Sequence, residues 1–208
     1  MSGIDKLVYF KFFLLLLIMN NRPSPRERIL AEAFQLFYTQ GYNLTGINQI
    51  LKESKVAKAS LYQHFGSKEE LGVEYIKKVR KDWFESFENH LAKKTSYKEK
   101  LLATFDFLEM NMKLNDFLGC RFLNLLSDIG TTSKKMQNQI IEHKSKVRLY
   151  FNDLVKAHLK STKSGVSTPN PGDTVFLLFE AAIVESKVHR DVWPIRVAKK
   201  SVDTILST

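Results

Sequence analysis

The chain has 208 residues, of which 44% are hydrophobic and 12% aromatic, so it can bury a core, and this composition excludes wholesale disorder. Its net charge of +10 favours a polyanionic partner. Residues 1–82 and 83–208 each carry +5, so charge alone does not separate a nucleic-acid-binding protein from a merely basic one. The single cysteine, Cys120, excludes a disulfide framework or a multi-cysteine metal site within one chain.

An apolar run lies near the start of the chain, at residues 7–19. It has 13 residues interrupted only by Lys11, whereas a membrane-spanning helix needs roughly 20. No small-residue cleavage site follows it, which argues against a secretory signal. We expect residues 1–22 to be an apolar extension with a basic arm, the working protein to begin at Met19 and its location to be cytoplasmic. A membrane tether by residues 7–19 and a packed extension are the alternatives.

Apolar residues recur at spacings of three and four almost throughout, and glycine and proline are scarce, which predicts an all-α fold. Residues 25–40 form the first expected helix, which Gly41 ends. We expect Thr45 to cap a second, short helix, and residues 57–64 to form a third after a turn at residues 54–56. Two short helices across such a turn make a helix-turn-helix. The residues expected to face inward are Ile47, Ile50, Leu51, Leu61 and Phe65.

A second, larger domain is predicted after this motif, so that the chain divides into residues 23–68 and residues 69–208. Ser67 and Glu70 form a capping-box pattern that opens a long fourth helix. Residues 97–114 follow as a helix that is apolar on two opposed faces, which places it between layers in the middle of the domain. Its two stripes are Leu101, Phe105, Leu108 and Met112, and Ala103, Phe107, Met110 and Leu114.

Four further segments complete the second domain. A short helix is expected at residues 119–129 and a long one at residues 133–160, before a polar linker at residues 161–169. Asn170 and Pro171 supply an N-cap and a first-turn proline for the next helix. The last helix is expected to carry Ile195, Ala198, Val202, Ile205 and Leu206 on one face.

The stretch from Ser54 to Lys68 contains no acidic residue, and its helix is small at the leading edge and aromatic at the trailing edge. The major groove of B-DNA is about 12 Å wide and admits such a helix. Lys58 suits a phosphate or a guanine edge, and Gln63 suits adenine. The helix starts at Thr45 and Lys68 favour an anion. A helical hairpin with a solvated polar face is the alternative. The expected DNA contacts are Thr45, Lys58, Ala59, Ser60, Tyr62, Gln63, His64 and Lys68.

Residues 28–76 resemble the amino-terminal domain of the TetR family of transcriptional regulators. The resemblance implies a homodimeric repressor whose variable carboxy-terminal domain binds a small molecule and whose last two helices, residues 171–207 here, pair the subunits. It also implies DNA contacts at the eight positions named above. The matching residues are Ile29-Leu30, Ala33-Phe34, Leu36-Phe37, Gly41-Tyr42, Thr45, Ile50, Lys58-Ala59-Ser60-Leu61-Tyr62-Gln63-His64-Phe65 and Ser67-Lys68-Glu69-Glu70-Leu71.

Two positions depart from the pattern of that family. Lys55 stands where the turn commonly has glycine, so a left-handed backbone there would be strained by the Cβ atom. Ala57 stands where serine is common, so a helix cap is missing. Both departures bear on the affinity for DNA more than on the fold.

The second domain offers a candidate ligand pocket. Gly119 to Asn124 resembles a motif of one TetR subgroup, and neighbouring aromatic and methionine side chains can line an apolar cavity with a few polar groups. Plain core packing is the alternative for these apolar residues. The candidate pocket residues are Phe105, Met110, Phe117, Cys120, Phe122 and Asn124.

No pattern in the sequence indicates a metal, a cofactor or an enzymatic reaction. The histidines lack metal-ligand spacing, and there is no Gly-rich phosphate loop, nucleophile elbow or metalloprotease signature. The sequence therefore predicts a transcriptional regulator: a ligand-released repressor that binds an inverted-repeat operator in double-stranded DNA as a homodimer and responds to an unknown small-molecule effector. The alternatives are a non-regulatory helical protein whose basic helix binds an acidic partner, and a membrane-tethered regulator.

Overall fold

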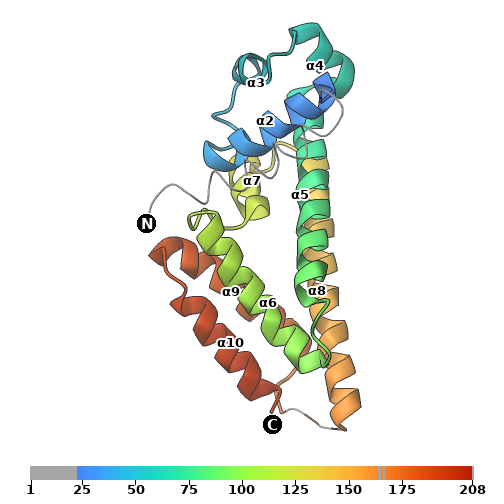
Figure 1. Ribbon diagram of the computed structural model, residues 1–208, viewed down its shortest axis with the longest axis vertical. Helices are drawn as coiled ribbons and strands as arrows, with labels where there is room; N and C mark the ends of the chain where they lie inside the picture. The colour runs from blue at the N-terminus through green and yellow to red at the C-terminus, as the bar shows by residue number, and fades with distance from the viewer. Residues whose placement is uncertain (1–22, 164, 166, 208) are drawn as a thin grey trace. The chain divides into compact units, whose positions relative to one another are not determined.

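A computed structural model describes residues 23–163, 165 and 167–207 of the chain, and over these residues it is all-helical, as predicted. Residues 1–22 lie outside the described part, and with them the expectations for the start of the protein and for a tether. Among the described helices, none is long and apolar enough to cross a membrane. Figure 1 shows helices α2 (Pro25–Thr39), α3 (Ile47–Ser54), α4 (Lys58–Phe65), α5 (Lys68–Leu91), α6 (Tyr97–Leu114), α7 (Arg121–Ile129), α8 (Lys134–Thr162), α9 (Pro171–His189) and α10 (Trp193–Ile205).

The chain divides into two compact units, one ending at Tyr75 and the other beginning at Ile76. This boundary lies inside α5, which is one continuous helix. The boundary predicted from the sequence, between residues 68 and 69, lies where that helix begins.

The amino-terminal unit packs α3 and α4 against α2. Ser24 caps α2 in a full capping box with Glu27, a signal that the sequence reasoning overlooked. Among the predicted inward-facing residues, Ile50, Leu61 and Phe65 are buried, and Ile47 and Leu51 are half-buried. The wider core of the unit contains Ile29, Ala33, Leu36, Phe37, Tyr42, Leu71 and Tyr75.

Aromatic rings and one ion pair tie the start of α5 to α2. The Tyr75 ring meets those of Phe34 and Phe37 edge to face, with centroids 5.8 and 5.4 Å apart. Arg26 pairs with Glu74 and also lies over the ring of Phe65, 5.2 Å from its centroid. These contacts hold the first turns of α5 within the amino-terminal unit.

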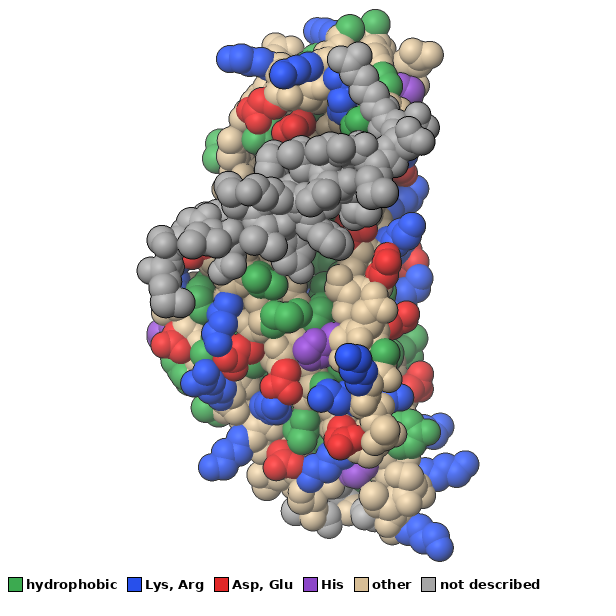
Figure 2. All heavy atoms as spheres, viewed as in Figure 1, with side chains coloured by type: hydrophobic (Ala, Val, Ile, Leu, Met, Phe, Trp, Pro, Cys, Tyr) green, Lys and Arg blue, Asp and Glu red, His purple; other side chains and the backbone are tan. Residues whose placement is uncertain are grey.

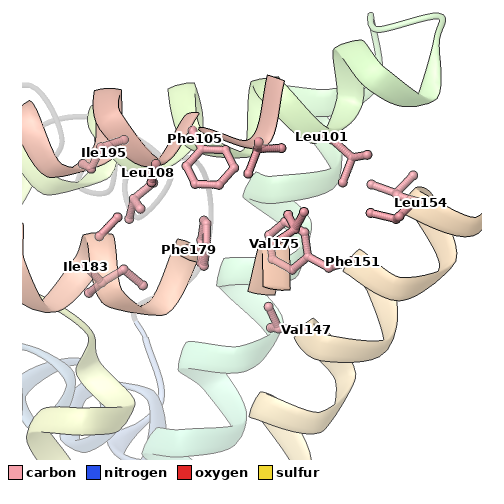
Figure 3. Close-up of a cluster of buried hydrophobic side chains, with 14 of the residues drawn as sticks. Leu101, Phe105, Leu108, Val147, Phe151, Leu154, Val175, Phe179, Ile183 and Ile195 are labelled. Atoms are coloured by element: carbon pink, nitrogen blue, oxygen red, sulfur yellow. The ribbon is translucent and has the colours of Figure 1, made fainter. Parts of the chain in front are cut away.

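In the carboxy-terminal unit, α6 packs against α8, α9 and α10, so its predicted central position is confirmed. Its first stripe belongs to the main core, where α6, α8, α9 and α10 converge on the side chains drawn in Figure 3. Ala103 and Phe107 of its second stripe are buried in a separate cluster with Phe87 and Leu91. The prediction is wrong for the rest of that stripe, because Met110 and Leu114 are 40% and 44% exposed.

Helices α8 and α9 approach closely at Gly172. A Cβ atom there would lie 2.7 Å from the Cα of Asn152, so only glycine fits this crossing. Next to it, Arg148 and Asn152 bind Asp173, and their hydrogen bonds lower the pKa of that carboxyl to about 2. Pro171 begins α9 as predicted, but Asn170 makes no side-chain cap because its backbone is left-handed, with φ of 47°.

Ion pairs join α6 to α10 along their length: Lys98 to Asp203, Asp106 to Lys199, and Glu109 to Arg196. Of the residues expected on the inner face of α10, Ile195, Ala198, Val202 and Leu206 are buried, and Ile205 is half-buried. Elsewhere on the carboxy-terminal unit, acidic and basic side chains are interspersed on the face drawn in Figure 2.

Candidate nucleic-acid interface

Helix α4 has one buried side and one exposed side. Leu61 and Phe65 point into the core, at 0% and 4% exposure, because residues four apart share a helix face. The opposite side is polar and basic. It exposes Lys58, Ala59, Tyr62, Gln63 and His64, with Ser60 half-buried beside them.

Thr45 does not belong to this surface. It is fully buried, and its hydroxyl donates to the Gly41 carbonyl oxygen at 2.7 Å. The N-cap of α3 is Gly46, which makes no side-chain cap, so the prediction of Thr45 as the cap is wrong. The sequence pattern was misleading because a threonine before a helix can turn its hydroxyl back to the preceding loop instead. Its side chain therefore offers nothing to a DNA backbone in this conformation.

Lys68 opens α5 and is half-buried. Its Nζ lies 4.4 Å from the centroid of the Tyr42 ring, a cation–π contact. Burial raises the pKa of Tyr42 to about 12, so the phenol is neutral under the ammonium group. Beside it, the Glu70 N–H donates to the Ser67 hydroxyl at 3.1 Å, the cap that the sequence predicted.

The turn between α3 and α4 centres on Lys55, whose backbone is left-handed with φ of 54°. The strain expected at this position is thus present, since a Cβ atom disfavours this region. Ala57 precedes α4 and makes no side-chain cap, also as expected. The Arg28 guanidinium donates to the Ser54 and Lys55 carbonyl oxygens at 3.1 and 3.2 Å. Sequence reasoning missed Arg28, because nothing in the spacing of residues links it to the turn.

Two exposed residues of α3 were also missed. Asn48 and Lys52 are four residues apart, so they share the outer side of α3 opposite the buried Ile50. The alternation of apolar and polar positions within residues 47–54 carried that signal. Lysine and asparagine can donate to phosphate oxygens, so these side chains extend the set of donors beside the turn.

These features together define the class of the protein. A short basic helix is held across a tight turn, with its polar side exposed and its apolar side fixed in a three-helix core. Its exposed side chains can donate to phosphates and to base edges in a major groove. This is the arrangement of a helix-turn-helix DNA-binding protein.

Comparison with known proteins agrees with this class. Residues 29–75 match the model of the family described as bacterial regulatory proteins, tetR family. The transcriptional regulator LmrA of Bacillus subtilis is 52% identical over 56 residues, which cover 26% of this chain and 30% of LmrA. The chain thus spans about a third of that relative's length. The transcriptional repressor NemR of Escherichia coli is 23% identical over 192 residues, covering 88% of this chain and 94% of NemR.

Solved structures share the fold over most of the chain. The reduced form of Escherichia coli NemR superposes with a TM-score of 0.76 at 22% identity, covering 88% of this chain and 97% of NemR. The TetR-family regulator SCO4454 of Streptomyces coelicolor gives 0.77 at 19% identity, covering 88% and 94%. Residues 29–75 match the TetR family, in agreement with the resemblance seen in the sequence, and over the longer alignments the solved structures share the fold. This is a family of transcriptional regulators and not of enzymes.

The candidate pocket residues of the second unit lie in different surroundings. Phe105 is fully buried in the main core, and Phe117 and Cys120 pack against that core from outside. Phe122 is buried and stacks on the His143 ring, with centroids 3.6 Å apart. Met110 is 40% exposed, so it does not share the enclosure of the others.

Two of the candidates make polar contacts across helices. Lys187 Nζ donates to Asn124 Oδ1 at 2.6 Å. Lys144 Nζ lies 3.6 Å from Cys120 Sγ and 2.5 Å from a carboxylate oxygen of Glu180. Burial by itself lowers the pKa of Lys144, but Cys120 and Glu180 outweigh it and the pKa is raised, so the amine stays charged. These polar side chains are therefore engaged with one another.

A histidine that the sequence reasoning passed over lies beside these residues. His143 is 3% exposed, its Nδ1 has no hydrogen-bond partner among the described residues, and the rings of Trp83 and Phe84 meet it edge to face. Burial, followed by the nearby charges of Lys144 and Arg80, lowers the pKa of His143 to about 3. The imidazole is therefore neutral at ordinary pH. A separate open groove of about 250 Å³, lined by Leu102, Arg196, Lys199, Lys200 and Asp203, contains none of the candidates.

Proposed function

We propose that the protein is a transcriptional repressor that binds an inverted-repeat operator as a homodimer and is released by a small molecule. The observation that carries the proposal is the exposed polar side of α4, formed by Lys58, Ala59, Tyr62, Gln63 and His64. This side would enter the major groove, with Lys58 and Gln63 at base edges and Tyr62 and His64 at phosphates. Lys68 would contribute from the first turn of α5, where the positive end of the helix dipole favours an anion. Thr45 has no part in this interface, because it is buried.

The homodimer would form through α9 and α10, within residues 171–207. An outer apolar face runs along these two helices, with large exposed side chains at Leu177, Val184, Val188, Trp193 and Val197. On α9 the residues are spaced by seven and four, so they form one stripe on the side away from the buried Val175 and Phe179. Exposed apolar side chains gathered on two helices that pack together favour a protein interface. A two-fold dimer would present two α4 helices to half-sites about 34–36 Å apart.

Selection of duplexes from a random-sequence pool by the unaltered protein tests both the partner and the symmetry. We expect enrichment of an inverted repeat, since a two-fold dimer reads two-fold DNA. Affinity for the enriched duplex should fall steeply with salt, because Lys and Arg release counterions from the phosphates. If no duplex is enriched and no salt-dependent affinity for DNA appears, the basic helix binds another acidic partner and the regulator is ruled out.

Single substitutions test whether α4 carries the DNA interface. Lys58→Ala should weaken binding to the enriched duplex by about 1–3 kcal/mol if it reaches a base edge, and Tyr62→Phe should weaken it less, through one lost hydroxyl donor. Lys156→Ala is the matched control, because Lys156 is also an exposed lysine but lies on α8. Equal losses for Lys58→Ala and Lys156→Ala would point to a general charge effect instead of a recognition helix.

The effector would bind in the carboxy-terminal unit, near the aromatic side chains around Phe117 and Phe122. What supports this is the set of rings from α5 and α7 around His143 of α8, whose Nδ1 has no hydrogen-bond partner among the described residues. Because α5 continues into the DNA-binding unit, a ligand that moved α5 would alter the spacing of the recognition helices, provided that it binds the released state more tightly. Such a regulator would work in the cytoplasm, where its DNA is.

Calorimetry with a library of apolar and aromatic compounds tests the effector. We expect at least one compound to bind and to weaken the affinity for the enriched duplex. Phe122→Ala should reduce that heat of binding, whereas Met110→Ala, at an exposed position of α6, should not. If no compound binds while DNA binding is intact, the ligand-released mechanism is wrong and the repressor responds to another signal.

A further inference from the structure

The end of α3 forms a Schellman motif with lysine in the position that normally takes glycine. The Val56 N–H donates to the Leu51 carbonyl oxygen at 3.2 Å, and the Lys55 N–H donates to the Lys52 carbonyl oxygen at 3.4 Å. This pair of bonds requires a left-handed residue after the helix, and Lys55 supplies it with φ of 54° and ψ of 44°. Lysine in that region is strained by its Cβ atom, so this turn is weaker than the same turn with glycine.

Arg28 reaches this strained turn from α2, a helix that lies earlier in the chain. Its Nη1 donates to the Ser54 and Lys55 carbonyl oxygens at 3.1 and 3.2 Å. These oxygens follow the last turn of α3, where carbonyl groups lack helical partners and a positive charge is favourable. A charged donor makes stronger hydrogen bonds than a neutral one. Arg28 therefore stabilises the left-handed conformation that Lys55 itself disfavours.

The leading end of α4 depends on this turn for its position. Three residues, 55–57, separate α3 from α4, and Ala57 gives α4 no side-chain cap. The two core anchors, Leu61 and Phe65, are the fourth and the last of the eight residues of α4, so neither is among its first three. Ahead of these anchors, Lys58 and Ala59 are exposed and Ser60 is half-buried, so the start of α4 is fixed mainly by the backbone of the turn.

We propose that Arg28 is a positioning residue for DNA reading: it compensates for the missing glycine at Lys55 and so fixes the leading turn of α4. The proposal rests on the proposed function, because positioning matters only if α4 reads DNA. It predicts that Arg28 governs discrimination between sequences more than contact with the phosphate backbone. It also predicts that the need for Arg28 disappears when residue 55 tolerates the left-handed region.

The test compares two DNA probes across a set of variants. One probe is the duplex enriched by the unaltered protein, and the other is a mixed-sequence duplex of equal length. Arg28→Met keeps the aliphatic stem and removes the guanidinium. We expect it to weaken binding to the enriched duplex about tenfold, the scale of one lost charge-assisted hydrogen bond. Binding to the mixed-sequence duplex should change by less than about threefold, which is the readout that a general loss of folding would not give.

Rescue at residue 55 separates geometry from charge. Lys55→Gly and Lys55→Asn both remove the charge and both tolerate the left-handed region, whereas Lys55→Gln removes the charge and does not. In the Arg28→Met background, the variants with glycine or asparagine at residue 55 should bind the enriched duplex about tenfold more tightly than the variant with glutamine. With Arg28 present, the three should differ by less than about threefold. Equal behaviour in both backgrounds overturns the proposal.

Hydrogen exchange gives a readout that does not need DNA. The Ser60 and Leu61 N–H groups form the first bonds of α4, to the Ala57 carbonyl oxygen. Their exchange should be about tenfold faster in Arg28→Met and should return toward the original rate when Lys55→Gly is added. The exchange rate of the Phe105 N–H in α6 should stay unchanged and serves as the reference. If Arg28→Met does not fold, the same comparison of Lys55→Gly with Lys55→Gln is made in Arg28→Lys.

The two readouts keep this inference distinct from the proposed function. If the unaltered protein enriches no duplex, the repressor function fails, and exchange at Ser60 and Leu61 decides whether Arg28 fixes α4. If the protein enriches a duplex but Arg28→Met exchanges and binds like the unaltered protein, the function stands and the role of Arg28 is wrong.

Discussion

The two units of the protein expose opposite kinds of surface. On α4 the exposed side chains are polar or basic, such as Lys58, Gln63 and His64, whereas on α9 and α10 they are apolar, such as Leu177 and Val188. A polar face is stable in water with or without its partner, so it suits a ligand that binds and leaves. An apolar face of this extent is stable only when covered. Under the proposed function, the contrast predicts a DNA contact that can be switched and a dimer contact that is permanent.

The largest expected effect tests the proposed dimer contact through the outer apolar face. Val184→Asp places a charge in the middle of the outer apolar face, and a buried unpaired charge is unfavourable by about 3–5 kcal/mol. Two-fold symmetry puts one such charge on each subunit. Light scattering should therefore find a monomer at micromolar concentration, with reduced affinity for the inverted repeat. Leu149→Asp, at an exposed apolar position on α8, is the control and should remain dimeric. A dimeric Val184→Asp protein would show that this face is not the interface.

The next effect tests whether Phe105 is core or pocket lining. Phe105→Ala removes a fully buried ring from the main core and should lower the free energy of unfolding by about 3–5 kcal/mol. Met110→Ala, on the same helix but 40% exposed, should change it by less than about 0.5 kcal/mol. Urea denaturation measures both. A small loss in the free energy of unfolding for Phe105→Ala would mean that the ring lines a space that can collapse or fill. Phe105 would then again be a candidate for the ligand site.

The next prediction concerns the carboxy-terminal unit alone: the free energy of unfolding should depend on pH through His143. Its pKa is about 3 in the folded protein and roughly 6.5 when unfolded. The unfolded chain therefore binds more protons between these values, and stability is lost as the pH falls from about 6.5 toward 3. The slope from this one group approaches 1.4 kcal/mol per pH unit. His143→Gln should remove that slope when denaturation is followed at several pH values. An unchanged slope would show that other groups cause the acid sensitivity.

The smallest effect comes from a matched pair of helix caps. Ser24 and Ser96 head α2 and α6 with the same capping box, closed by Glu27 and Glu99. Each serine-to-alanine change should lower the free energy of unfolding of its own unit by about 1 kcal/mol. Ser24→Ala should also weaken DNA binding slightly, because α2 carries Arg28, whereas Ser96→Ala should leave it intact. If both changes weaken DNA binding equally, the units are coupled more tightly than two separate cores suggest.

The contrast between the units also explains which features the sequence could predict. The helix-turn-helix, the exposed polar side of α4 and the left-handed Lys55 depend on contacts between neighbours in the chain, so spacing and turn residues predict them. Thr45 was misassigned because its hydroxyl could turn to α3 or back to Gly41, and local preference does not decide between them. Arg28 was missed because its partners, Ser54 and Lys55, lie more than 25 residues away.

In the carboxy-terminal unit, the sequence predicted the helices and the central position of α6, but not which side chains converge. The second stripe of α6 ends at Phe107 because its continuation, Met110 and Leu114, meets no covering helix within the described part of the chain. Periodicity alone cannot show where a neighbouring helix stops. The stacking of Phe122 on His143 joins α7 and α8 across an interval that no pattern in the sequence relates.

The positions of the two tryptophans give the protein a built-in pair of fluorescent reporters. Trp83 lies among rings, stacked on Phe87 with centroids 4.6 Å apart and meeting His143 edge to face, so its emission is sensitive to anything that disturbs that aromatic group. Trp193 is 48% exposed on the outer apolar face, so its emission should shift to the blue when a second subunit covers it. Replacing either one with phenylalanine leaves a single-tryptophan protein. The proposed effector binding and the proposed subunit assembly can then be followed separately, without any attached dye.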